Sequence, residues 1–442
     1  MASTYLTKTL GTATNRKKFT ISIWFKLGSS PVEQYFFSAG SSNNNSRIGL
    51  NGSGYISINQ ANSGTKVAEF QSDALLRDPA SWYHLVVAYD TTLGTAADRQ
   101  KVYLNGIQQT SFDTTNPPTD TEFTGFNNNI EHKIGTLYDN TSYFNGLMAN
   151  VEFVDGLQLT PAYFGSTDSN TGIWTPTATS AISDYGTNGF KLLMDTTTPG
   201  ADTSGKGNTF TVGGGTPTLT QGNPQNNWCT LNPLARFQVA PTYSNGNNTV
   251  TTGAGGAGNS PFSTLAVSSG KYYAEIKFTS TDSGGEAVGI VNLDSYNPYG
   301  QGDEYFYRHS YGYGYKNANG DKVTNNSGSS YGNSYTTGDV IGIALDMDNK
   351  KLYFAKNGTW QNSGDPTSGS TGTGSAFTLA DGTYAFTCYQ YYAHVKDWNF
   401  GEGFFGTTAA GTQADDNGQG LFAYDVPAGY YALNTKNLEA YG

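Results

Sequence analysis

The sequence predicts an all-β protein: two antiparallel β-sandwich domains of jelly-roll type, joined by an ordered, loop-rich connector. Three observations favour this fold class. Apolar and small polar residues alternate in short runs, as in FTISIWF at residues 19–25, which is typical of strands with one buried face. Glycine (56 residues) and tyrosine (31 residues) are abundant, and they favour tight turns and strands respectively. The length of 442 residues exceeds that of one ordinary domain.

Charge and cysteine content exclude several classes of protein. The net charge of −11 disfavours a nucleic-acid groove or an anionic membrane surface, because both attract Lys and Arg. No apolar run reaches the roughly 18 residues of a membrane-spanning helix, and residues 1–30 lack the order of a secretion signal. Cys229 and Cys388 are too few for a disulfide framework or a four-thiolate metal site. We expect both to be buried free thiols.

The first domain is expected over residues 1–165. Its strongest strand signals are the alternating runs at residues 19–25, 82–90, 101–106 and 144–153. The run at 101–106 ends in Asn-Gly, the pair most typical of a β-hairpin turn. Short strands separated by Gly, Asn and Asp, without a helical period, predict an antiparallel sandwich.

These runs resemble, in the same order, the laminin-G/concanavalin-A-like lectin superfamily. The matching phrases are ISIWF at residues 21–25, WYHLVV at 82–87, VYLNG at 102–106 and a closing set between 134 and 161. The resemblance implies a β-sandwich domain and, by analogy, allows a calcium ion in it. Many members carry an acidic pair before the last strand, where this chain has Ala149 and Asn150. No calcium or ligand role is therefore carried over to that position.

The connector is expected over residues 166–243. It contains three phrases: DYGTNGF at residues 184–190, DTSGKGN at 202–208 and NNWCTLNPL at 226–234. A loop segment this long is unusual unless something ties it down, so we expect its apolar residues to pack against neighbouring sheets, with one strand at residues 190–194.

In this order, after a laminin-G-like domain, the three phrases resemble a segment of structural proteins of tailed phages. The phrases contain no motif typical of a catalytic or metal site, and we take them as signs of common descent. The resemblance implies a protein of the phage particle that contacts other virion proteins.

The second domain is expected over residues 244–405. Alternating runs at residues 270–278, 338–346 and 383–389 predict strands. The phrases YG at 331–332, GDVIG at 338–342, FAKNG at 354–358 and NFG at 399–401 resemble the SPRY (B30.2-like) domain. That resemblance implies a β-sandwich binding module without catalytic activity. Residues 406–442 carry an apolar rhythm and are expected to pack back onto this domain.

The sequence predicts no catalytic residues. Retaining glucanases of the concanavalin-like fold need two carboxyl groups about 5 Å apart. The nearest pair, Glu152 and Asp155, is spaced so that the two side chains point to opposite faces of a strand. The histidines have no metal-binding spacing; they are His84, His132, His309 and His394.

Two sets of residues are candidate sites. Asp346 and Asp348 could ligate calcium through their oxygens, although a hairpin turn explains the same residues. In the second set, the loop tyrosines Tyr296 and Tyr299 are candidate ligand contacts, because a tyrosine combines an apolar ring with a hydroxyl group. The alternating tyrosines nearby are expected mostly in the core; they are Tyr305, Tyr307, Tyr311, Tyr313 and Tyr315.

Together these features predict a non-enzymatic structural protein of a phage, a tail fibre or a capsid fibre or decoration. We expect it to be made in the host cytoplasm, to lie on the virion surface and to bind a host-surface glycan or protein. A homotrimer is the expected oligomer, with no nucleic acid bound and no membrane insertion. The alternative is a concanavalin-like glycan-degrading enzyme of the virion. A cellular adhesion or scaffolding protein is a third reading, which the missing export signal disfavours.

Overall fold

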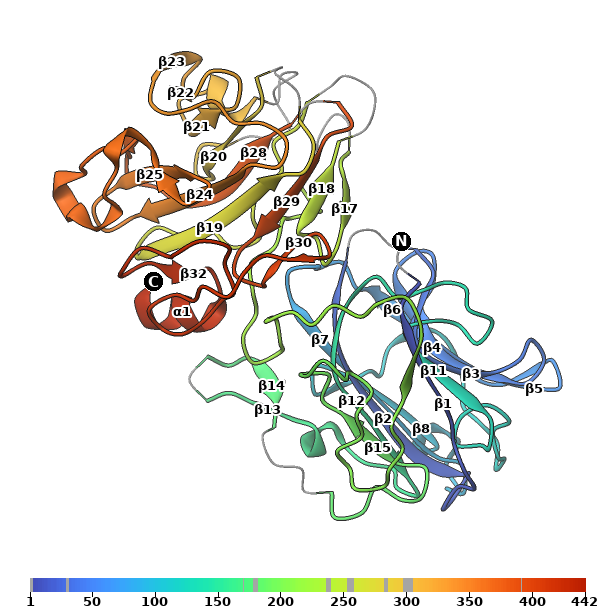
Figure 1. Cartoon of the computed structure of the whole chain (residues 1–442). Coiled ribbons are helices and arrows are strands. Elements are labelled where there is room, and N and C mark those ends of the chain that lie inside the picture. The colour runs from blue at the N-terminus through green and yellow to red at the C-terminus, as the bar shows by residue number, and fades with distance from the viewer. Residues whose placement is uncertain are drawn as a thin grey trace. The chain divides into compact units, whose positions relative to one another are not determined.

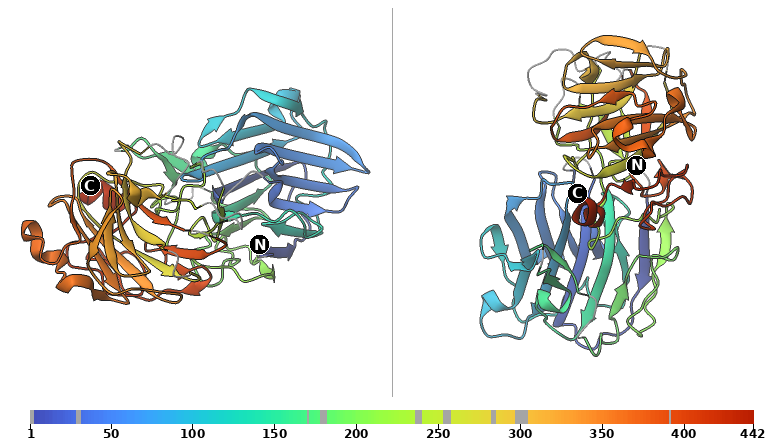
Figure 2. Two further views of the ribbon diagram at one scale, coloured as in Figure 1. Left: turned by 90° about the horizontal axis from the view of Figure 1, so that it is seen from above. Right: turned by 90° about the vertical axis from the view of Figure 1, so that its left-hand side faces the viewer.

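The computed structural model describes residues 3–28, 32–169, 171–177, 182–235, 240–252, 258–281, 285–296, 305–390 and 392–442. The chain forms two compact units, Met1–Leu219 and Thr220–Gly442. Strands make up most of the regular structure of both units, and nearly all of them pair antiparallel (Figure 1). Layers of strands face each other within each unit (Figure 2). The predicted all-β class is confirmed.

Unit 1 contains two large sheets. The eight-stranded sheet has the order β10 (Phe112–Asn116), β6 (Thr65–Leu75), β5 (Tyr55–Asn62), β4 (Asn45–Leu50), β3 (Gln34–Gly40), β11 (Glu131–Ile134), β1 (Tyr5–Thr9), β16 (Thr211–Gly214). The six-stranded sheet has the order β15 (Phe190–Leu192), β12 (Gly146–Asp155), β2 (Lys18–Leu27), β7 (Trp82–Asp90), β8 (Gln100–Leu104), β9 (Ile107–Gln108). A small hairpin and two short 3-10 helices complete the unit: β13 (Gly165–Thr167), β14 (Trp174–Pro176), η1 (Ala96–Asp98) and η2 (Pro161–Tyr163).

The core of unit 1 lies between these sheets, where the period-2 alternation places the apolar residues. In six strands of the eight-stranded sheet, from β6 to β1 in the strand order, one row of paired residues is buried and apolar: Leu6, Ile134, Phe37, Ile48, Ile58 and Phe70. From β2 of the other sheet, Phe19, Ile21, Ile23 and Phe25 join the same core. The run at residues 19–25 is therefore a strand, as its alternation predicts.

The segment at residues 166–243, expected as a connector, is divided between the two units after Leu219. Its first part belongs to unit 1, where β15 pairs with β12 and β16 pairs with β1. The strand expected at residues 190–194 is present but ends at Leu192. Met194 has a φ of 61°, which is outside the extended region and therefore cannot continue a strand.

Unit 2 also contains two large sheets. The longer one has the order β17 (Thr242–Ser244), β18 (Thr249–Thr251), β29 (Val395–Asn399), β19 (Lys271–Phe278), β24 (Val340–Asp346), β25 (Lys351–Lys356), β26 (Thr359–Trp360), with β27 (Phe377–Thr378) on β25 and β32 (Tyr431–Ala432) on β19. The other has the order β23 (Ser327–Ser330), β22 (Asp321–Thr324), β21 (Gly312–Lys316), β20 (Ala287–Asn292), β28 (Tyr384–Tyr389). The remaining elements are β30 (Phe404–Phe405), β31 (Thr408–Ala409), η3 (Phe306–Arg308), η4 (Gln361–Ser363), η5 (Pro366–Thr371) and α1 (Thr435–Tyr441).

Residues 406–442 pack against the long sheet of unit 2 through β32, which pairs in parallel with β19. Glu275 on β19 fixes the segment further, since its carboxylate accepts hydrogen bonds from the backbone N–H groups of Ala423 and Tyr424. Cys229 and Cys388 are free and buried, as predicted. Among the described residues, no helix is long and apolar enough to cross a membrane.

Candidate functional site

Glu152 and Asp155, the closest match in the sequence to the catalytic carboxyl pair of a glucanase, both make hydrogen bonds within the fold. Glu152 accepts a hydrogen bond of 2.5 Å from the hydroxyl of Tyr185 and lies 3.7 Å from Nζ of Lys191. Asp155 is only 2% exposed. Its two oxygens accept four hydrogen bonds of 2.5–3.1 Å, three of them from backbone N–H groups. Neither group is free to protonate a glycosidic oxygen or to attack a sugar.

The DYGTNGF phrase at residues 184–190 is a clamp on β12. Tyr185 holds Glu152, and the backbone N–H of Asn188 donates to Asp155 at 3.1 Å. Gly186 has a φ of 74°. A Cβ atom there would lie 2.2 Å from the carbonyl oxygen of Asp155, so this close approach requires glycine.

The DTSGKGN phrase at residues 202–208 lies at the edge of the six-stranded sheet, beside β15. The carboxylate of Asp202 accepts hydrogen bonds of 2.8–2.9 Å from the N–H groups of Lys191, Ser204 and Asn208. The side-chain amide of Asn208 donates in turn to the carbonyl oxygens of Thr187 and Gly189, at 2.9 Å each. The phrase therefore ties its own turn to the end of the clamp described above.

The NNWCTLNPL phrase at residues 226–234 is held by hydrogen bonds in unit 2. The N–H of Asn227 donates to Oγ1 of Thr435 at 3.0 Å, and the N–H of Cys229 donates to the carbonyl of Leu433 at 3.0 Å. The phrase thus lies against the C-terminal segment. All three phrases have a structural role, which is consistent with their lack of chemical motifs.

His84 is a structural residue inside unit 1. Its ring stacks on Trp24 at a centroid distance of 4.3 Å. Nδ1 accepts a hydrogen bond of 2.9 Å from Nε1 of Trp174, and Nε2 lies 2.8 Å from Oγ of Ser22. Burial lowers the pKa of His84 to about 3, so the ring is neutral at ordinary pH. The same cause lowers the pKa of His132 to about 4.

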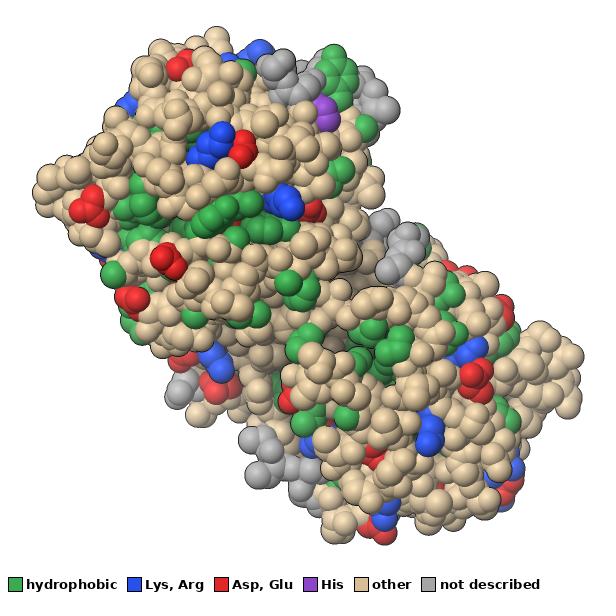
Figure 3. All heavy atoms as spheres, in the orientation of Figure 1, with side chains coloured by type: hydrophobic (Ala, Val, Ile, Leu, Met, Phe, Trp, Pro, Cys, Tyr) green, Lys and Arg blue, Asp and Glu red, His purple; other side chains and the backbone are tan. Residues whose placement is uncertain are grey.

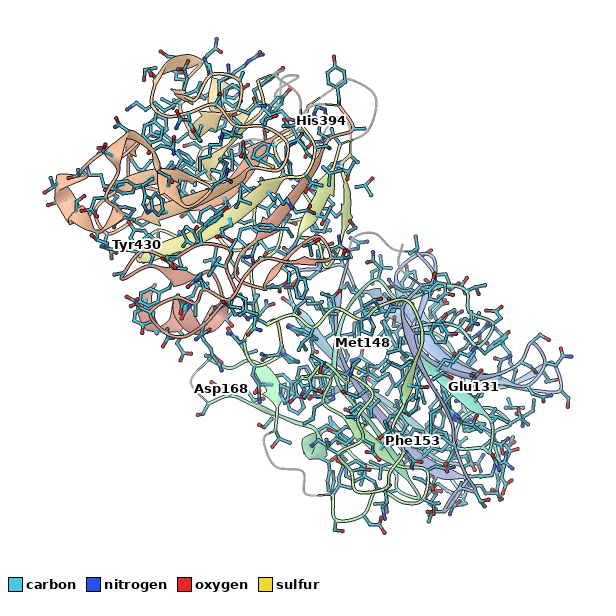
Figure 4. The ribbon with its side chains drawn as sticks, viewed as in Figure 1. Glu131, Met148, Phe153, Asp168, His394 and Tyr430 are labelled. Atoms are coloured by element: carbon cyan, nitrogen blue, oxygen red, sulfur yellow. The ribbon has the colours of Figure 1, made fainter. Side chains whose placement is uncertain are left out.

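Unit 2 holds a buried charged cluster at the end of β29. Glu286 lies 2.8 Å from Nδ1 of His394 and 2.8 Å from Nζ of Lys396 (His394 is labelled in Figure 4). The side chains of Glu286 and Lys396 are fully buried. Opposite charges neutralise each other in this cluster, which indicates a structural role.

The predicted metal ligands Asp346 and Asp348 lie around a turn between β24 and β25. Asp346 is 0% exposed. Its carboxylate accepts two hydrogen bonds of 2.8 Å from Asn349 and lies 3.2 Å from Nζ of Lys271. Asp348 is exposed and accepts a hydrogen bond of 2.8 Å from the N–H of Gly270. No group of three or more His, Cys, Asp or Glu side chains in the described part of the chain is arranged to hold a metal ion. These hydrogen bonds are the ones expected of a hairpin turn, the alternative to a calcium site.

The predicted contact residue Tyr296 is half-buried, and its ring lies 5.6 Å from that of Tyr311. Tyr311 stacks on His309 at 4.8 Å. Nearby in sequence, the guanidinium of Arg308 lies 3.6 Å above the ring of Tyr305. We call Tyr296, Tyr305, Arg308, His309 and Tyr311 the aromatic patch. Tyr299, the other predicted contact, lies outside the described residues.

The alternating tyrosines are not all in the core. Tyr307 and Tyr315 are buried, whereas Tyr305, Tyr311 and Tyr313 are half-buried. A tyrosine at every second position would lie on one face of a strand, but residues 306–308 form η3 and only residues 312–316 form β21. After this break Arg308 is exposed, whereas Tyr305 stays half-buried with its ring stacked on Tyr389 at 3.8 Å. Alternation alone could not predict this placement.

Comparisons with known proteins identify both domains. Residues 2–162 match the family described as the concanavalin A-like lectin/glucanases superfamily, and residues 271–387 match the SPRY domain family. The chain is similar to the solved SPRY domain of human HERC1, with 20% identity over 38% of this chain and 96% of that one (TM-score 0.30). It is also similar to the heptameric SAP-like pentraxin of Limulus polyphemus, with 17% identity over 36% and 72% (TM-score 0.27). A search of curated proteins finds no match. The chain therefore contains a concanavalin A-like domain followed by a SPRY domain, as the two resemblances implied.

Proposed function

We propose that this chain is a structural protein on the surface of a tailed-phage particle, where its two domains bind the host surface without catalysis. The observation that carries the proposal is that the chain combines two binding-type domains, while Glu152, Asp155 and His84 are all used for structure. The resemblance of the three connector phrases to phage structural proteins supports the virion location.

The aromatic patch is the part of unit 2 best suited to contact a host ligand. A half-buried tyrosine ring can stack on the apolar face of a sugar, and its hydroxyl can bond to the sugar or to a protein partner. Arg308 adds an exposed cation above Tyr305. Elsewhere, charged side chains are scattered over the face shown in Figure 3 rather than gathered into one field. We therefore expect recognition through stacking and hydrogen bonds more than through long-range charge.

Within the particle, the chain would be part of a tail fibre or a capsid fibre or decoration, in contact with other virion proteins. It would be made in the host cytoplasm before assembly, and fibre symmetry makes a homotrimer the expected state. Mass spectrometry of purified particles tests the location: the chain must be present in them. Absence from the particles would contradict the virion role.

Binding of the purified chain to host cells tests the attachment role. The double substitution Tyr296→Ala and Tyr311→Ala should weaken binding, whereas Tyr163→Ala, at an exposed tyrosine of unit 1, is the matched control. Equal binding by both variants would exclude the patch. Release of reducing sugar from host polysaccharide, abolished by one Asp or Glu substitution, would favour the glycan-degrading enzyme instead.

A further inference from the structure

The buried ion pair of Glu286 and Lys396 connects the two large sheets of unit 2. Glu286 comes directly before β20 of the five-stranded sheet, and Lys396 lies on β29 of the long sheet. Nζ of Lys396 lies 2.8 Å from Oε2 of Glu286, and both side chains are 0% exposed. In the ion pair of Lys271 and Asp346, by contrast, the lysine side chain is 24% exposed. In the Glu286–Lys396 pair an amine nitrogen is therefore held beside a carboxyl group away from solvent.

The surroundings of this pair favour neutral groups. Nζ of Lys396 lies 4.8 Å from the centre of the Phe278 ring. Cys388 interacts with both charges, and burial raises the pKa of its thiol to about 12, so it stays neutral at ordinary pH. Burial penalises charged groups because it removes their water. Transfer of one proton from Nζ to Oε2 turns the ion pair into a neutral amine beside a carboxylic acid, the two groups from which an amide forms.

Neighbouring side chains fix both groups in place. Nδ1 of His394, which is labelled in Figure 4, lies 2.8 Å from Oε1 of Glu286. Oγ1 of Thr281 donates a hydrogen bond to Oε2 of Glu286. Nζ of Lys396 donates to the carbonyl oxygen of Ser280 at 2.8 Å. Because the reacting groups are already in contact, little entropy remains to be lost when they react.

From this geometry we infer that Lys396 and Glu286 condense to an amide, which cross-links β29 to the start of β20. The lone pair of Nζ attacks Cδ of the protonated carboxyl group, the bond from Cδ to Oε1 breaks, and Oε1 leaves as water. The carboxyl proton and one proton of the amine leave with this water. His394, in contact with Oε1, supplies it with a proton as it leaves and regains one from the attacking nitrogen. No oxidant or other co-reactant is needed.

The cross-link would give unit 2 the kind of constraint that a disulfide gives other domains. Cys229 and Cys388 are the two cysteines of the sequence, and both are free. An amide between residues 286 and 396 closes a long loop and so restricts the unfolded chain. Reducing agents do not break an amide, and its formation does not require an oxidising compartment. The linkage would form whether or not the chain binds a host surface.

The test is mass spectrometry of the purified full chain after incubation in the folded state. Wild type should be lighter than the mass given by its sequence by one water molecule. Trypsin does not cut at an amide-linked lysine, so residues 278–308 should appear joined to residues 357–436 in a digest of the denatured chain. Lys396→Met should have full mass and release residues 278–308 as a separate peptide. Lys271→Met, the matched control, removes the lysine of another ion pair of unit 2 and should still lose the water.

The role of His394 is tested by the rate of the reaction. In a freshly synthesised chain the cross-linked fraction can be followed with time. His394→Gln should slow its increase by about a hundredfold or more, the usual contribution of acid–base catalysis. An equal rate in wild type and His394→Gln would overturn the role given to His394.

A wild-type chain of full mass that releases residues 278–308 as a separate peptide would overturn the cross-link itself. This measurement does not depend on whether any variant folds. A loss of water confined to a single peptide would also overturn it, because a cyclised aspartate loses the same mass without joining two segments of the chain.

Discussion

Acidification should destabilise unit 1 through His84. The indole of Trp174 can only donate, so Nδ1 of His84 must be the acceptor in their 2.9 Å hydrogen bond. Nε2 therefore carries the proton and faces Oγ of Ser22. A second proton, on Nδ1, would point at the N–H of Trp174 in a buried site. Geometry and burial both oppose protonation, in agreement with a pKa lowered from 6.5 to about 3.

The sign and size of the effect follow from linkage. The unfolded chain takes up the proton at a higher pH than the folded chain does. The contribution of neutral His84 to the free energy of unfolding is therefore complete above pH 6.5 and is lost as the pH falls towards 3. Between pH 7.5 and pH 5 the loss is about 2 kcal/mol. His132, with a pKa of about 4, adds a similar loss. Glu152 acts in the opposite direction, since burial raises its pKa.

The assay compares wild type with His84→Gln, which cannot titrate. Urea unfolding followed by tryptophan fluorescence gives the free energy of unfolding at both pH values, and amide hydrogen exchange in β2 and β7 assigns the change to unit 1. The variant should lose about 2 kcal/mol less than wild type on acidification. His309→Asn, in unit 2, should leave exchange in β2 and β7 as in wild type. Equal losses in wild type and His84→Gln would refute the reasoning. So would an NMR titration of the wild-type chain that gives His84 a pKa near 6.5, a measurement that does not need a folded variant.

Three further predictions concern the structural carboxylates. Asp155→Ala removes the acceptor of four hydrogen bonds and should destabilise unit 1 by about 3–5 kcal/mol in urea unfolding; an unchanged midpoint would contradict the clamp. Burial raises the pKa of Glu275 to about 7, so its contribution is present below pH 4.5 and lost as the pH rises through 7. Glu275→Gln should flatten this dependence, of up to about 3 kcal/mol, in unfolding measured from pH 5 to 8. Finally, a chelator should not change the melting temperature of the chain, because Asp346 is held by Lys271 and Asn349; a fall that calcium reverses would show a metal site.

Local signals in the sequence predicted the strongly alternating strands, such as β2, β7 and β24, but not β3 to β6 of the eight-stranded sheet. The Asn-Gly pair at residues 105–106 forms the expected hairpin: both residues have positive φ, and Leu104 pairs with Ile107. Alternation failed where a short helical turn interrupts it, at residues 306–308, because a tyrosine every second position is also compatible with turns.

Residues that act across long sequence separations could not be predicted in this way. Asp155 looked like half of a weak acidic pair, yet it holds residues 14–15 and Asn188, which only the folded chain brings to it.

The DYGTNGF phrase helps the chain to cover the six-stranded sheet of unit 1. A β-sandwich has two outer faces, and a chain can cover one with its own residues or leave it for a ligand. In unit 1, Tyr185 and Asn188 of the DYGTNGF phrase fasten the segment that covers the six-stranded sheet. The phrase therefore uses its polar groups to hold the chain on its own sheet.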